Sequence, residues 1–108
     1  MIKAIFYRDS DKRYKGFSVE GHAGYADSGE DIICSAVTAL TFNTINSITA
    51  LTDNECIVES GASGSIKFKF KSGSDDDGQL LVSALTLGLT EICKEYGDKY
   101  LRVYFKEV

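Results

Sequence analysis

Five short stretches of the chain carry the apolar, largely alternating pattern of β-strands. They are residues 2–7, 14–20, 56–59, 65–71 and 101–106. The alternation is strictest in the fourth, where Ile66, Phe68 and Phe70 are separated by lysines. A period of two is typical of antiparallel sheets with one face on the core and the other in solvent.

Two longer stretches change to the period of an amphipathic helix. The first is expected to begin at Glu30 and to end near Leu51, with Asp27, Ser28 and Asp31 as candidate capping side chains. The second runs from Leu81 to Tyr96, after a polar loop at residues 72–78, and Gly97 is its expected C-cap. The order ββαββαβ predicts one α+β domain, residues 1–108, with a largely antiparallel sheet and two helices packed on it.

Composition narrows the class of protein. Apolar residues make up 44% and charged residues 26%, no apolar run reaches about 18 residues, and the N-terminus lacks the apolar segment of a signal peptide. We therefore expect a cytoplasmic protein with no membrane contact. Three widely spaced cysteines, no Cys-x-x-Cys pair and a single histidine argue against a disulfide framework and a structural zinc site. No metal or cofactor is expected.

The net charge of −4 disfavours general nucleic-acid binding, and no direct binding of this kind is expected, although a local basic stripe remains open. The lysines at 67, 69 and 71 form such a stripe; a solvated face or edge protection is favoured over a ribosome contact. The acidic run at residues 75–77 is interpreted as a solvated start of a helix, with attraction of a basic substrate tail as the alternative.

Candidate chemistry gathers around the start of the first helix. Unpaired N–H groups and the helix dipole favour an anion there, and Cys34 lies in the first or second turn. The only histidine, His22, precedes Cys34 by twelve positions, across a Gly-rich loop. The loop can fold the imidazole back over the helix start, so that thiol, base and helix N-terminus converge. The same N–H groups, with that of Cys34 among them, are candidates for an oxyanion hole.

Ordinary interpretations compete with this hypothesis. A free cysteine on a helix is usually a small core residue, as we expect for Cys56 and Cys93. Asp31 either orients the histidine or stabilises the helix start, and the second role is favoured. Glycines in the loop either act as hinges or only make tight turns. Spacing alone leaves Cys34 and His22 as a plausible reactive pair.

Two sequence segments add a resemblance. Gly-His-Ala at 21–23, then Gly-Glu-Asp-Ile-Ile-Cys-Ser-Ala-Val-Thr at 29–38, is similar to the bacterial ribosomal-processing cysteine proteases of the Prp family. The resemblance covers nearly the whole chain. It implies Cys34 as nucleophile, His22 as general base, removal of the N-terminal extension of a large-subunit ribosomal protein, and a homodimer.

Further residues are expected to support this site. Gly21, Asp31 and Ser35 are the candidate supporting residues. The expected substrate loop, which orders over bound peptide, consists of Ala23, Gly24, Tyr25, Ala26, Asp27, Ser28, Gly29 and Glu30. Two alternatives to a protease remain, namely a non-catalytic ribosome-associated peptide-binding module and a redox-sensing thiol protein.

Overall fold

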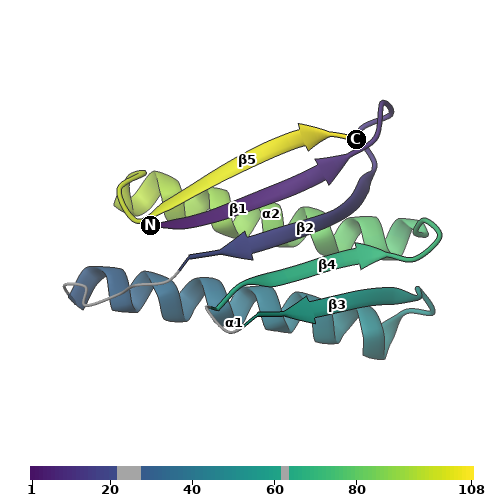
Figure 1. Ribbon diagram of the computed structural model, residues 1–108, viewed down its shortest axis with the longest axis horizontal. Helices are drawn as coiled ribbons and strands as arrows, with labels where there is room; N and C mark the ends of the chain where they lie inside the picture. The colour runs from purple at the N-terminus through teal and green to yellow at the C-terminus, as the bar shows by residue number, and fades with distance from the viewer. Residues whose placement is uncertain (22–27, 62–63) are drawn as a thin grey trace.

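The protein has two layers, a five-stranded sheet and a pair of helices that both cover the same face of it (Figure 1). The computed structural model describes residues 1–21, 28–61 and 64–108, with the backbone alone at 28–31. In chain order the elements are β1 (Ile2–Arg8), β2 (Tyr14–Glu20), α1 (Ser28–Leu51), β3 (Cys56–Ser60), β4 (Ile66–Phe70), α2 (Asp76–Tyr96) and β5 (Leu101–Glu107). This order confirms the predicted ββαββαβ fold.

The strands lie in the order β3-β4-β2-β1-β5. Neighbours pair antiparallel except for β1 and β5, which run parallel from Ile2 beside Leu101 to Arg8 beside Glu107. Strand β4 has the same direction as β1 and β5, because it is antiparallel to β2, which is antiparallel to β1. Two strands of the same direction cannot be joined by a tight turn, and α2 provides the long connection from β4 to β5. The sheet is therefore largely antiparallel, as its alternating pattern predicts.

The core lies between the sheet and the helices. The ring centroids of Phe17 and Phe68, on adjacent strands, are 4.8 Å apart, and Phe6 lies beside Phe17 at 5.8 Å. From the helices, Ile33, Val37, Ile45 and Ile48 of α1 and Val82, Leu85 and Leu89 of α2 are buried against the sheet. The alternation seen in the sequence thus separates this inner face from an outer face that no helix covers (Figure 1).

Both helices begin earlier than the pattern predicts. Helix α1 begins at Ser28, two residues before Glu30. Helix α2 begins at Asp76, inside the loop predicted for residues 72–78, because the Asp75 carboxylate accepts a hydrogen bond from the Gly78 N–H at 2.9 Å and caps the helix. Gly97 ends α2 with a φ of 82°, which confirms the predicted C-cap.

Helix α1 contains no charged residue from Ile32 to Leu51. By length and composition these 20 residues, with a mean hydropathy of 1.3, are apolar enough to cross a membrane, whereas the sequence was expected to contain no such run. The core helix of a soluble protein passes the same test, and one side of α1 packs on the sheet. The hydroxyls of Thr41 and Thr44 donate to the carbonyls of Val37 and Leu40. The helix is therefore weak evidence for a membrane.

Candidate functional site

Cys34 lies in the second turn of α1, because the helix begins at Ser28. At 1.5 Å per residue it is about 9 Å from the helix start. The unpaired donors of a helix are the N–H groups of its N-cap and of its first three residues, which in α1 are residues 28–30. The Cys34 N–H lies inside the helix, six residues after its start. Its part in an oxyanion hole remains a prediction, and the unpaired N–H groups of the helix belong to the preceding turn.

The side chain of Cys34 lies at the boundary between core and solvent. Its neighbours Ile33 and Val37 are 2% and 1% exposed, whereas Ile32 is 62% exposed and Ser35 is exposed as well. Cys34 itself is half-buried, unpaired with another cysteine, and packed against the hydrophobic core. One side of the thiol is thus fixed by packing while the other side remains accessible, as a nucleophile requires.

Gly21 ends the sheet portion of the chain and begins the connection that carries His22. Its φ is 91°, and a Cβ there would collide with the carbonyl oxygen of Met1. The Ile2 N–H donates to the Tyr100 carbonyl at 2.8 Å, so the start of β1 is tied to the segment before β5. Gly21 therefore has a positioning role that no other residue type can fill without strain.

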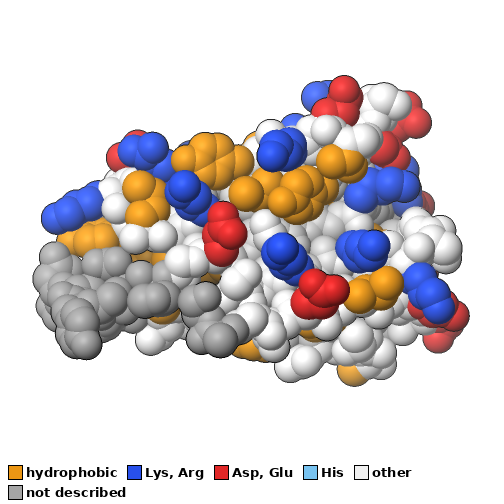
Figure 2. Space-filling model, viewed as in Figure 1, with side chains coloured by type: hydrophobic (Ala, Val, Ile, Leu, Met, Phe, Trp, Pro, Cys, Tyr) orange, Lys and Arg blue, Asp and Glu red, His pale blue; other side chains and the backbone are white. Residues whose placement is uncertain are grey.

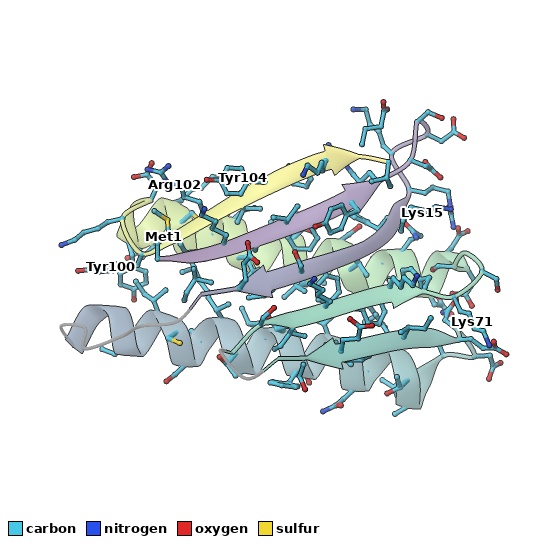
Figure 3. All side chains as sticks on the ribbon, in the orientation of Figure 1. Met1, Lys15, Lys71, Tyr100, Arg102 and Tyr104 are labelled. Carbon is cyan, nitrogen blue, oxygen red and sulfur yellow. The ribbon has the colours of Figure 1, made fainter. Side chains whose placement is uncertain are left out.

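At this same end of the sheet, Met1 and Tyr100 lie close together, with the N-terminal half of α1 alongside (Figure 3). Spacing gives no signal for Met1 and Tyr100, because the contacts at this end join Met1 to Gly21, 20 residues away, and Ile2 to Tyr100, 98 residues away. The glycine before His22 was the one local clue.

The remaining predicted site residues are only partly described. His22 and residues 23–27 lie outside the described residues, as do the side chains of Ser28, Gly29, Glu30 and Asp31. The backbone of residues 28–30 belongs to the first turn of α1 and not to the predicted loop. The separation of His22 from Cys34, and the role of Asp31, remain predictions.

The two other cysteines have the surroundings of structural residues. Cys56 and Cys93 both pack against the core, as predicted, although each is only half-buried. The Cys93 thiol lies 3.2 Å from the Leu101 carbonyl, to which it donates. Burial raises the pKa of the Cys56 thiol, and burial together with Asp98 raises the pKa of Cys93. Neither thiol is favoured as a thiolate.

Metal binding has no evident place in the described part of the chain. Within residues 1–21, 28–61 and 64–108, no three His, Cys, Asp or Glu side chains are grouped to hold an ion.

The family model described as "Cysteine protease Prp" matches residues 1–101. The chain belongs to this family. It is 33% identical over 108 residues to the ribosomal processing cysteine protease Prp of Bacillus subtilis, and the match covers 95% of this chain and 96% of that one. It is 28% identical to the Prp of Staphylococcus aureus, with 82% and 83% covered. The chain is thus a cysteine protease by family.

Solved structures share the fold. The S. aureus Prp crystallised with a substrate peptide superposes with a TM-score of 0.90 at 22% identity, over 98% of this chain and all of that one. The same enzyme with a covalently linked product peptide gives 0.88 at 23%. A Streptococcus mutans protein gives 0.88 at 26% identity, over 100% and 99% of the two chains.

Proposed function

We propose that this family member is a cysteine endopeptidase in which Cys34 is the nucleophile and His22 the general base. The observation that carries the proposal is the position of Cys34. It is a half-exposed free thiol near the start of α1, and the connection from β2 to that helix carries the only histidine of the chain. The other two thiols have raised pKa values and hydrogen bonds to backbone carbonyls.

The reaction follows from these two groups. His22 takes the thiol proton, and the Cys34 sulfur attacks the carbonyl carbon of the scissile peptide bond. The unpaired N–H groups at the start of α1 are the donors for the developing oxyanion. When the C–N bond breaks, His22 returns the proton to the leaving amine. Water then attacks the thioester, which releases the acid product and restores the thiol.

The proposed substrate is the N-terminal extension of a large-subunit ribosomal protein, cleaved in the cytoplasm during ribosome assembly. Support comes from relatives named as ribosomal processing proteases and from a relative crystallised with a substrate peptide. We also propose a homodimer. Large apolar side chains are exposed on both helices, among them Leu51, Leu80 and Leu87 at 77%, 66% and 63%.

The test is incubation with the N-terminally extended ribosomal protein from the same organism, followed by mass spectrometry of the products. Wild type should release one defined extension. Cys34→Ala and His22→Ala should lose at least about a thousandfold in rate, because each removes a member of a cooperating pair. Cys93→Ala, matched in residue type, should retain activity. Equal cleavage by wild type and Cys34→Ala would refute the proposal.

The same experiment distinguishes the peptide-binding module. If the protein only holds the extension, wild type and Cys34→Ala should bind it with equal affinity, and neither should release a product. A redox sensor would show reversible modification of Cys34 by peroxide in the absence of any peptide.

A further inference from the structure

The outer face of the sheet, which neither helix covers, carries a hollow of about 530 Å³ over β1, β2, β3 and β4. Tyr7, Gly16, Ser18 and four lysines are among the residues that line it. Cys34 lies on the helical side, so this hollow is separate from the proposed protease site.

A β-bulge shapes the hollow. Tyr7 of β1 pairs with Gly16 and Arg8 pairs with Tyr14, so Lys15 has no partner. Such a bulge turns a side chain to a new direction, and Lys15 lines the hollow beside Gly16 instead of alternating away from it. The Gln79 side chain of α2 holds the bulged strand by accepting from the Tyr14 N–H at 2.7 Å and donating to its carbonyl at 2.8 Å.

Gly16 leaves a gap in the outer face at the hollow. It pairs with Tyr7 on one side and with Lys69 on the other, so the missing side chain leaves a gap between those two. A Cβ at this position would collide with the carbonyl oxygen of Phe68 on β4. Next to the gap, Ser18 is 4% exposed, and its hydroxyl lies 3.4 Å from that of Tyr7. The floor is therefore closely packed and its polar groups face each other.

Positive charge is concentrated around this floor. Lys15, Lys67, Lys69 and Lys71 line the hollow with Glu59 as the one acidic side chain, a surplus of three positively charged side chains in a chain of net charge −4. Lys71 pairs with Glu55 at 3.7 Å, both exposed. Among the described residues, no carboxylate lies within 4.0 Å of the other three ammonium groups.

Lys and Arg side chains are spread over this face in Figure 2, with acidic side chains between them, and Lys15 and Lys71 lie at the same end of the sheet in Figure 3. The expectation that no nucleic acid binds was drawn from net charge, which averages over the local surplus of lysines at the hollow.

Two tyrosines share this face with the lysines. Tyr7 lines the hollow itself. Tyr104 of β5 is 40% exposed and diagonal to Tyr7, because Ile5 pairs with Tyr104 and Tyr7 with Lys106, so β1 and β2 separate it from the lysines of β4. Lys67 and Lys69 of β4 are two residues apart, about 7 Å, and Lys71 follows the end of the strand. A positively charged groove with aromatic rings beside it is the combination that binds single-stranded nucleic acid, where phosphates meet cations and bases stack on rings.

We propose that this face binds single-stranded RNA, with the lysines at the hollow on the phosphates and Tyr104 stacked on a base. The choice of RNA rests on the proposed function, since the relatives are named as ribosomal processing enzymes. An acidic peptide would satisfy the lysines but would leave the tyrosine ring unused. A second copy of the chain would bring like charges together at the hollow.

The test is fluorescence anisotropy of a labelled oligouridine against the full chain at several salt concentrations. Wild type should bind with a log–log salt slope near −3, because four lysines each contribute about −0.7 on a single strand. Lys69→Glu should weaken binding at least about tenfold and flatten the slope. Lys94→Glu makes the same charge change on α2 and should leave the affinity within about twofold of wild type. Tyr104→Ala should weaken binding with no change of slope.

Three outcomes would overturn the proposal. They are no binding of the RNA by wild type at about 50 mM salt, preference for poly-glutamate over the RNA, or a dimer that Lys69→Glu dissociates. Peptide cleavage is measured separately with the extension as a free peptide, and Lys69→Glu should cleave it at the wild-type rate. If wild type cleaves the peptide but does not bind the RNA, this inference alone is refuted. If wild type does not cleave the peptide, the proposed function is refuted.

Discussion

Gly16 offers a severe test of the bulge and of the close approach of β2 to β4. In Gly16→Ala the new methyl would meet the Phe68 carbonyl oxygen and lie 3.0 Å from the Lys69 Cα. These are backbone atoms of a neighbouring strand, so relief requires the two strands to move apart. Overpacking in a well-packed region costs about 1–3 kcal/mol, and the rigid neighbour places Gly16→Ala at the upper end.

The measurement is urea unfolding of the variant and of a matched glycine substitution. With a slope of about 1–1.5 kcal/mol per molar for a small domain, the midpoint should fall by about 2 M. Gly61→Ala is the control, because its Cβ would lie 3.6 Å from the Ser65 Cβ, an ordinary contact, and it should change stability by less than about 0.5 kcal/mol. If Gly16→Ala unfolds at the wild-type midpoint, the bulge is not as described and the floor of the hollow is wrong.

Further predictions concern the cap, the thiols and the bulge. Hydrogen bonds lower the pKa of Asp75 from its ordinary 3.8, so its stabilisation is present above that value and fades as pH falls; the difference in melting temperature between wild type and Asp75→Ala should shrink in acid. Iodoacetamide mapping at neutral pH should label Cys34 before Cys56 and Cys93, whose pKa values are raised; an equal rate at all three would contradict the site. Gln79→Ala should cost about 1 kcal/mol in urea unfolding, since it removes two hydrogen bonds to the backbone of β2.

The sequence predicts the layers of the fold because the patterning is local. Residues 65–71 alternate strictly, and the structure buries Ile66, Phe68 and Phe70 to between 3% and 6% exposure, each facing the helices. The helix starts were less predictable. Residues 27, 28 and 31 all have side chains that can cap a helix, so the sequence allows several starting points for α1. The start of α2 is fixed by the Asp75 cap, and Asp75 is held by hydrogen bonds to Asn54, 21 residues away.

The candidate site divides in the same way. Cys34 and His22 were found from spacing and resemblance, because nucleophile, loop and base are consecutive in the sequence. The outer face was interpreted as a solvated stripe, because the bulge at Lys15 and its support by Gln79 depend on pairing between distant segments. Gly16 inside a predicted strand was the available signal, since an interior glycine often marks a bulge or a close backbone approach.

The central claim is that Cys34 forms a covalent bond with the substrate. Its most direct test is rapid acid quenching of the enzyme during cleavage of the extended ribosomal protein, followed by mass spectrometry of the intact chain and its peptides. The account predicts a chain heavier by the N-terminal product less one water, with the thioester on the peptide that contains Cys34, and no such species in Cys34→Ala. Turnover without that adduct, joined with wild-type cleavage by Cys34→Ala, would contradict it.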